Sequence, residues 1–211
     1  MVTQTVTLPS KNGEPTWEAV DRLPRQGDWT EEEFLRHFDD RGYEYVDGRV
    51  EVLPLPDVNH QLLAADLFNA ARAAAEPLGG RTLFMGLRLR VPSPGGTGSR
   101  LREPDVLHVT DAQLAAATRQ YVHAAEWAAE VVSSPDGRRR DLEEKRDDYA
   151  RAGVKEYWIV DPRDRLILVL SLDRATGTYT EHARHADGDI ATSPLLPALK
   201  VNVTTLLGDP A

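Results

Sequence analysis

Capping signals and the spacing of hydrophobic residues predict the helices of this chain. Residues 1–28 are rich in proline, glycine and charge and show no clear period, so we expect a loose arm there. Thr30 and Glu33 then form a capping box ahead of a hydrophobic run, which indicates a helix start. A later helix is predicted over residues 141–152, where Gly153 closes it.

A longer helix is predicted between these two, over about residues 60–76. Either Asp57 or Asn59 can cap its first turn, because both side chains accept hydrogen bonds from free backbone N–H groups. The residues expected on its buried face follow helical spacing and are Leu62, Leu63, Leu67 and Ala70.

Strands are predicted on both sides of this helix. Asp47-Gly48 separates two strand-like runs, 43–46 and 49–53, and this dipeptide is a strong signal for a tight hairpin. Alternation of hydrophobic and other residues over 83–91 predicts one continuous strand.

The rest of the chain is expected to be mostly β-structure, with a short helix within 111–123. Further strands are predicted at 104–107, 126–133, 156–160 and 166–172. A hairpin that turns at Asp187-Gly188 should follow, and residues 199–207 should form a strand and one helical turn. This order indicates a mixed β-sheet flanked by helices, in the α/β or α+β class, with residues 29–211 as one domain.

Composition narrows the chemistry of the chain. It has 211 residues, of which 41% are hydrophobic and 28% charged, as is ordinary for a soluble globular protein. There is no cysteine, which excludes disulfides, thiolate metal sites and cysteine nucleophiles. No hydrophobic run is long enough to span a bilayer and no secretory signal is visible, so we expect a cytoplasmic protein without membrane contacts.

The charge of the chain argues against indiscriminate binding of nucleic acid. Its formal net charge is −9, which repels phosphate, although a local basic patch could still bind it. Such a patch is either a phosphate-tracking rim or a solvated loop, and its candidate residues are Arg88, Arg90, Arg100, Arg102, Arg138, Arg139 and Arg140.

Three ionisable residues are candidates for chemistry. Glu130 lies inside the apolar run Trp-Ala-Ala-Glu-Val-Val, where a buried carboxylate would need a cation, although strand alternation could instead point it to solvent. Asp105 follows Pro104 at the start of a short strand, a pattern that also occurs in turns. Lys145 lies four residues after Asp141 on one helix face, where it could equally be a solvated side chain.

These three residues are more informative together than each is alone. Two carboxylates on neighbouring strands can bind one Mg²⁺ through oxygen, with water completing the coordination. Such a metal polarises a phosphoryl oxygen and activates water, while a nearby ammonium stabilises developing negative charge. These are the parts of a metal-dependent phosphodiesterase.

Five stretches of the chain carry a family resemblance. They are EPDV around Asp105, EVVSSP from Glu130, DLEEKRDDYARAGVKEYWIVDP from Asp141, and the flanking YEYVDGRVEVLPLPDVNH and SPLLPALKVNVTTLL. Over roughly residues 30–207, the chain resembles the bacterial Uma-two family of predicted endonucleases, in the PD-(D/E)XK restriction-endonuclease-like superfamily.

The resemblance implies a central mixed sheet flanked by helices. It implies that Asp105 is the aspartate of the PD motif and Glu130 the acidic residue of the following strand. The lysine that the superfamily pattern expects two residues later is Val132 in this chain. Lys145 matches the helical lysine that is thought to take over in this family.

Further residues complete the expected site. Glu44 and His60 match other polar positions of the family and could face the metal. Asp141 is expected to orient Lys145, and the backbone carbonyl of Val131 is a further candidate metal ligand. The implied cofactor is Mg²⁺, with Mn²⁺ as a substitute, and the superfamily favours a homodimer.

The leading hypothesis is therefore a Mg²⁺-dependent endonuclease that acts on DNA. The sequence leaves an RNA substrate open. A rival interpretation is a non-catalytic, oligomeric binding or scaffold module that retains the fold, which the acidic net charge and the absent strand lysine favour.

Overall fold

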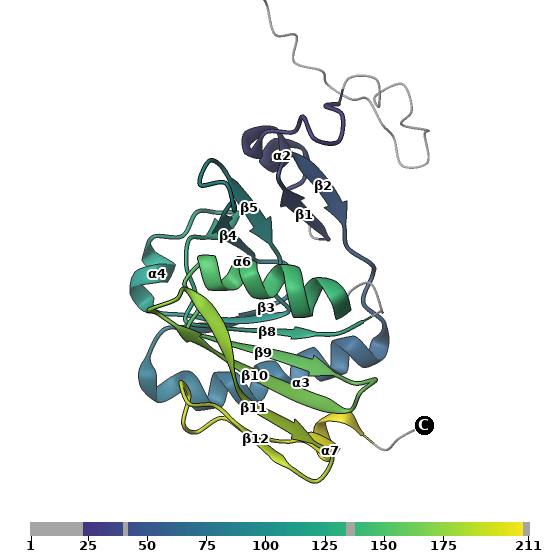
Figure 1. Cartoon of the computed structure of the whole chain (residues 1–211), viewed down its shortest axis with the longest axis vertical. Helices are drawn as coiled ribbons and strands as arrows, with labels where there is room; N and C mark the ends of the chain where they lie inside the picture. The colour runs from purple at the N-terminus through teal and green to yellow at the C-terminus, as the bar shows by residue number, and fades with distance from the viewer. Residues whose placement is uncertain (1–22, 40–41, 134–137, 209–211) are drawn as a thin grey trace, which may run out of the picture.

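The computed structural model describes residues 23–39, 42–133 and 138–208, and two β-sheets organise it (Figure 1). The larger sheet contains β3 (Arg81–Phe84), β6 (Val106–Val109), β8 (Trp127–Val131), β9 (Glu156–Asp161), β10 (Leu166–Asp173) and β11 (Thr178–Ala186). Its strand order is β11-β10-β9-β8-β6-β3. Only β8 and β9 pair in parallel within this sheet, so the chain between them must cross over.

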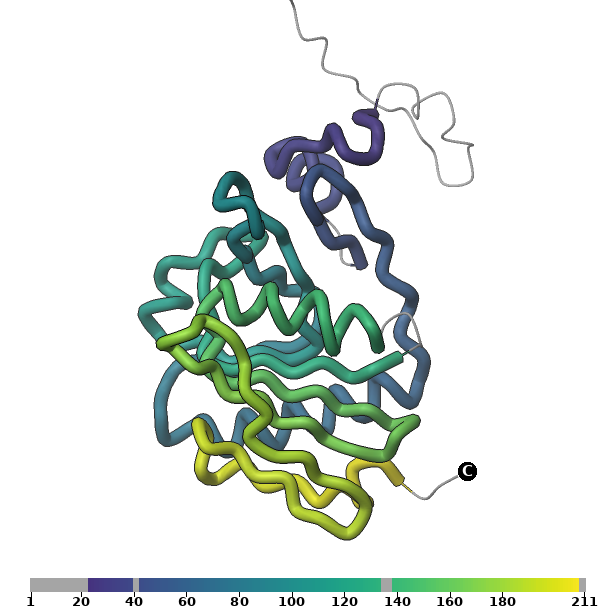
Figure 2. The backbone as a smooth tube through the Cα atoms, in the orientation of Figure 1, coloured from purple at the N-terminus to yellow at the C-terminus, as the bar shows by residue number. Residues whose placement is uncertain are grey.

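The smaller sheet has five strands in the order β2-β1-β5-β4-β7. They are β1 (Tyr43–Val46), β2 (Arg49–Val52), β4 (Arg88–Pro92), β5 (Ser99–Arg102) and β7 (Tyr121–Val122). A separate pair consists of β12 (Ile190–Thr192) and β13 (Lys200–Asn202). The tube in Figure 2 shows how the chain passes from the smaller sheet into the larger one.

Helices lie on both faces of the six-stranded sheet. The helices of the described residues are α2 (Glu31–His37), α3 (Val58–Ala75), α4 (Asp111–Ala115), α6 (Lys145–Arg151) and α7 (Val203–Leu207), with a 3₁₀ turn at Glu76–Leu78 and a π-helical turn at Arg140–Glu144. The long helix α3 packs on one face, whereas α6, which belongs to the crossover from β8 to β9, packs on the other (Figure 1). No helix in the described part of the chain is both long and apolar enough to cross a membrane.

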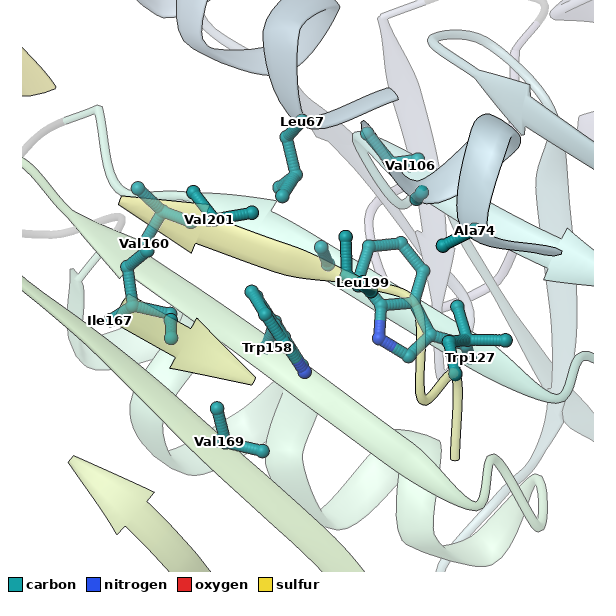
Figure 3. Close-up of a cluster of buried hydrophobic side chains, with 14 of the residues drawn as sticks. Leu67, Ala74, Val106, Trp127, Trp158, Val160, Ile167, Val169, Leu199 and Val201 are labelled. Atoms are coloured by element: carbon teal, nitrogen blue, oxygen red, sulfur yellow. The ribbon is translucent and has the colours of Figure 1, made fainter. Parts of the chain in front are cut away.

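Alternation along β8 divides its side chains between the two layers. The side chains that face α3 are Trp127, Ala129 and Val131. Trp127 meets Trp158 of β9 there, with ring centroids 5.9 Å apart, in the cluster drawn in Figure 3. Ala128 and Glu130 point the opposite way, toward α6, because successive side chains of a strand alternate. The alternation along β8 therefore places the Glu130 carboxylate in the layer beneath α6.

Several local predictions are confirmed. The Thr30 hydroxyl accepts a hydrogen bond from the Glu33 N–H at 3.2 Å, as a capping box requires. The Asp47-Gly48 hairpin forms, and a Cβ on Gly48 would lie 2.4 Å from the Gly27 carbonyl oxygen, so that glycine is required. Asp57, one of the two predicted caps, begins α3 by accepting from the backbone of the third residue of the helix. The final strand and helical turn within 199–207 also form.

The expected arm is described only in part. Residues 1–22 lie outside the described residues. Residues 23–28 run along the first hairpin, where the Gly27 N–H donates to the Gly48 carbonyl at 2.7 Å and the Gln26 side chain exchanges hydrogen bonds with Val50.

The predicted continuous strand at 83–91 is wrong. The chain turns at Met85 and Gly86, both with positive φ, and the two halves become β3 and β4 in different sheets. The Met85 N–H donates to the Asp105 carbonyl at 2.9 Å, which fixes the turn against the start of β6. The alternation of hydrophobic and other residues continues across the break because β3 and β4 each bury one face independently.

Three further predictions need correction. The turn at 187–188 forms, but β12 pairs with β13 and not with β11, so the predicted hairpin is wrong. Leu62 is 60% exposed instead of buried, because the buried stripe of α3 runs through Leu63 and Leu67. The helix predicted at 141–152 begins earlier, with a π-helical turn at its start.

Candidate active site

A cavity of about 300 Å³ lies where the two sheets meet. Its wall is built from residues 53–56 after β2, the Met85-Gly86 turn, residues 103–105 between β5 and β6, the end of β8, and the π-helical turn. Six of the residues that the sequence predicted for the site line it, namely His60, Asp105, Glu130, Val131, Asp141 and Lys145.

Asp105 is fixed at the edge of the cavity where β6 begins. Its Oδ2 accepts a hydrogen bond from the Val131 N–H at 2.7 Å and lies 3.1 Å from His60 Nε2. The first contact joins the start of β6 to the end of β8, and the second joins it to the first turn of α3. The aspartate therefore occupies a defined position instead of serving only as a turn residue.

Glu130 is buried beneath α6, with 3% of its surface exposed. Its Oε1 accepts hydrogen bonds from Lys145 Nζ at 2.7 Å and from the Tyr149 hydroxyl at 2.5 Å. The alternative that Glu130 points to solvent is wrong, because strand alternation directs it into the layer where an ammonium and a phenol meet it.

Lys145 is also buried, so the solvated alternative is wrong for this residue as well. Its Nζ lies 2.7 Å from Glu130, 3.4 Å from Glu44 and 3.7 Å from Asp141. Glu44 reaches it from β1 of the other sheet, while the second Glu44 oxygen accepts from Arg102 at 2.8 Å. The ammonium thus connects carboxylates from both sheets.

Asp141 and His60 each have a buried atom without a hydrogen-bond partner in the described part of the chain. For Asp141 this atom is Oδ1, and for His60 it is Nδ1. The sequence expectation of a same-face contact between Asp141 and Lys145 is met as an ion pair, although Glu130 lies closer to the ammonium. Polar atoms that protein groups leave unsatisfied next to a cavity mark where a ligand or solvent can bind.

The electrostatics of the site follow from an excess of carboxylates around Lys145. Burial raises the pKa of Glu130 well above its usual value, and Asp105 and Asp141 add to the rise against the opposing effect of Lys145. Burial likewise raises the pKa of Asp141 to about 6. Burial opposes the charge of Lys145, but Glu130, Glu44 and Asp141 outweigh it and raise its pKa, so the ammonium keeps its proton. Clusters with such shifted pKa values are typical of functional sites.

The donor set suits a magnesium ion better than a metal held wholly by protein. No group of three histidine, aspartate or glutamate side chains in the described residues is arranged to hold a metal. Mg²⁺, however, takes only one or two carboxylates and keeps several waters. Asp105 and Glu130 line the cavity together. The Val131 carbonyl faces the same side as its N–H, toward Asp105, because both groups of an extended residue point the same way.

Neither alternative for the arginine patch, a phosphate rim or a solvated loop, fits Arg88, Arg100 and Arg102. Arg102 is fully buried, and its guanidinium binds Glu44 at 2.8 Å and Asp148 at 2.6 Å. Arg88 pairs with Glu103, and Arg100 pairs with Asp148. These guanidinium groups connect strands of the smaller sheet with one another and with α6, which the sequence could not show because their partners are distant along the chain.

Two residues of the site were not singled out from the sequence: Tyr149 had no role assigned, and Arg140 was only one of seven arginines in a candidate patch. Tyr149 donates to Glu130, and its spacing of four from Lys145 would have placed it on the same helix face. Arg140 lines the cavity from the π-helical turn. Nothing in the sequence pattern signals such a turn, so only the structure could separate Arg140 from its two arginine neighbours.

The arrangement has the chemistry of a site for a phosphate ester. Two carboxylates and a backbone carbonyl can hold a divalent cation, while a buried ammonium supplies fixed positive charge beside them. Asp141 adds a carboxylate oxygen, Oδ1, that has no hydrogen-bond partner in the described residues and lies 3.7 Å from Lys145 Nζ.

Comparison with known proteins agrees with this geometry. A family model described as "Uma2: Putative restriction endonuclease" matches residues 29–204. Among solved structures, the chain is similar to the crystal structure of "a putative nuclease belonging to DUF820" from Anabaena variabilis ATCC 29413, with a TM-score of 0.65 and 16% identity over 85% of this chain and 97% of that one. No curated protein matches it. The expected restriction-endonuclease-like architecture, a mixed sheet flanked by helices, is confirmed.

Proposed function

Because the chain belongs to the Uma2 family, we propose that it is a metal-dependent endonuclease that hydrolyses phosphodiester bonds in DNA. The observation that carries the proposal is the convergence of Asp105, Glu130 and Lys145 on one cavity, from three separate stretches of sequence. Hydrolysis adds water across one P–O bond and leaves a phosphate on one side and a hydroxyl on the other.

Asp105 and Glu130 would hold Mg²⁺ or Mn²⁺, with the Val131 carbonyl as a third ligand. When bound, the metal would polarise a phosphoryl oxygen and lower the pKa of water. His60 holds the Asp105 carboxylate from α3, and Tyr149 and Lys145 hold that of Glu130, so both acids are oriented before a metal binds.

Lys145 acts as a permanent positive charge in this proposal. Its raised pKa keeps it protonated, so it cannot accept a proton from water. Its ammonium instead offsets the charge that develops on the phosphate oxygens, and Glu44 and Glu130 fix its position. Asp141 Oδ1 faces the cavity without a hydrogen-bond partner in the described residues and is the group we assign as acceptor of a proton from water.

Plasmid cleavage by Asp105→Asn tests the proposal. In Mg²⁺ or Mn²⁺ we expect wild type to cut and the variant to lose more than about 100-fold in rate, because even groups that only orient metal ligands are worth 10- to 100-fold. Asp66→Asn, an exposed aspartate on α3, is the matched control and should cut at the wild-type rate.

One result would contradict the proposed site, and another would contradict the nuclease itself. Equal cutting by wild type and Asp105→Asn would remove Asp105 from the site. Calorimetry that detects no metal binding, together with DNA binding that is absent at low and high salt, would favour the rival scaffold module. A parallel assay on RNA separates the two nucleic-acid substrates.

The proposal also includes a homodimer, a cytoplasmic location and a single domain over residues 29–211. Sedimentation of the purified chain measures the first of these, and a monomer at all concentrations would contradict it. Limited proteolysis that leaves a stable fragment beginning near residue 29 would support the domain boundary.

A further inference from the structure

Arg140 is a cation of the cavity wall that no carboxylate of the described residues neutralises directly. Its side chain lines the cavity, and its Nε is buried without a hydrogen-bond partner there. None of the ion pairs within 4.0 Å in the described residues includes its guanidinium. A buried guanidinium nitrogen without a partner is costly unless a ligand or solvent completes its hydrogen bond.

The neighbouring arginines differ from it in this respect. Arg138 binds Asp161 at 2.7 Å, and Arg139 pairs with Glu144 at 3.2 Å with most of its side chain exposed. Arg102, deeper in the fold, also has one buried nitrogen, Nη2, without a hydrogen-bond partner in the described residues, but Glu44 and Asp148 pair with its guanidinium. Arg140 therefore differs from the arginines that pair directly with a carboxylate, and its side chain lines the same cavity as Asp105 and Glu130.

The π-helical turn explains why Arg140 faces the cavity. In a regular α-helix, residues five apart point about 140° away from each other, so Arg140 and Lys145 would lie on different faces. Here the Lys145 N–H donates to the Arg140 carbonyl, five residues back. This wider turn brings both side chains toward the same side of the helix. Both residues, together with Asp141, line the cavity.

We propose that Arg140 binds the non-bridging oxygens of the phosphodiester that is cut, and that the π-helical turn exists to place it there. The inference rests on the proposed nuclease function and adds a phosphate-contacting residue to it. A guanidinium presents a planar fork of N–H donors that matches a phosphate, and it is permanently charged. Such a group is needed because the carboxylates around the cavity, and the net charge of −9, would otherwise repel the substrate.

Arg140→Ala and Arg139→Ala form a matched pair, because each removes one arginine charge from adjacent positions. We expect Arg140→Ala to lower the rate of plasmid cleavage about 100-fold, as removal of one fixed donor to a developing negative charge does. Arg139→Ala should stay within about threefold of wild type, because its guanidinium is exposed and paired outside the cavity. Arg140→Lys should recover part of the loss, since it restores the charge without the fork.

Binding measured without metal provides a readout independent of cleavage. In the Asp105→Asn background with a chelator present, anisotropy of a short fluorescein-labelled DNA duplex should show weaker binding for Arg140→Ala than for Arg139→Ala. The salt dependence of Arg140→Ala should also be shallower by about one counterion. Thermal unfolding of both variants verifies that each is folded.

The outcomes separate this inference from the nuclease proposal. If wild type cuts and the two alanine variants cut and bind alike, the role of Arg140 is overturned while the nuclease stands. If wild type does not cut in either metal but the binding contrast remains, the nuclease proposal falls and the phosphate contact stands. A chain that binds no duplex overturns both.

Discussion

Two buried charge clusters lie next to each other in this protein, and they differ in how their charges are balanced. In the first, which we call the Arg102 network, Arg102 binds Glu44 and Asp148 without exposure to solvent. In the second, which we call the acid cavity, Asp105, Glu130 and Asp141 share one wall. Glu44 links the two, because it binds Arg102 with one oxygen and faces Lys145 with the other.

The difference appears in the pKa values of the carboxyl groups. Burial alone would raise the pKa of Glu44, but Lys145 and Arg102 outweigh it and lower the pKa to about 2. Burial raises the pKa of Asp141 to about 6 because its neighbours include Asp105 and Glu44 as well as cations. In the Arg102 network, cations thus outweigh the burial of Glu44, whereas the acid cavity retains a repulsion that a bound cation would relieve.

The largest expected effect is on stability and comes from the Arg102 network. Arg102→Met should lower the free energy of unfolding by about 3–5 kcal/mol, because it leaves Glu44 and Asp148 buried without their cation. Urea titration measures this loss. Arg36→Ala removes an exposed pair with Glu32 and should change stability by less than about 0.5 kcal/mol. Similar losses in the two variants would mean that the Arg102 network contributes no more than a surface pair.

Glu44→Gln should have a smaller effect of the same sign. The folded-state pKa of Glu44 is lowered from 4.5 to about 2, so its charge stabilises the protein above pH 4.5, and this stabilisation is lost as pH falls through 2. At neutral pH the variant should lose roughly 2–3 kcal/mol of stability. Urea titrations from neutral to acid pH should show the gap closing below pH 4.5; a gap that is constant with pH would contradict the charge explanation.

Asp141→Asn should have the smallest effect and the opposite sign. Its folded-state pKa is raised from 3.8 to about 6, so the contribution of this group to stability is fully present below pH 3.8 and is lost as pH rises through 6. Well above pH 6 the amide variant should therefore be more stable than wild type by roughly 1–3 kcal/mol. The two proteins should converge below pH 4, and the variant should cut DNA more slowly. A variant that is less stable at all pH values would show that the acid cavity is as well balanced as the Arg102 network.

Local signals in the sequence were sufficient for several elements of the fold. The Thr30 capping box, the Asp47-Gly48 hairpin and the cap at Asp57 involve groups within a few residues of one another, so the pattern contains both partners. The broken strand at Met85 and the partner of β12 depended instead on distant segments. Alternation reports which residues of a strand are buried, but it does not report against which strand they pack.

The residues of the candidate site likewise divide into those that the sequence could single out and those that it could not. Glu130 was singled out because a carboxylate in an apolar run needs a partner, and Lys145 was found by its resemblance to a family pattern. Arg102 was expected in a phosphate rim or a solvated loop, although it is buried, because an arginine in an alternating strand looks the same whether it meets solvent or a carboxylate. Arg140 was not distinguished from Arg139, since the turn that separates them has no sequence signal.

The sequence by itself was sufficient to identify most helices and strands and the family to which the chain belongs, and it singled out the acidic residues that we propose for a metal. Only the tertiary structure decided which charges are neutralised and which remain open to a ligand. The physical reason is that the energy of a buried charge depends on partners within a few ångströms, and these come from segments far apart in the chain. Helix caps and tight turns, in contrast, depend on interactions among a few consecutive residues, so the local sequence is sufficient to predict them.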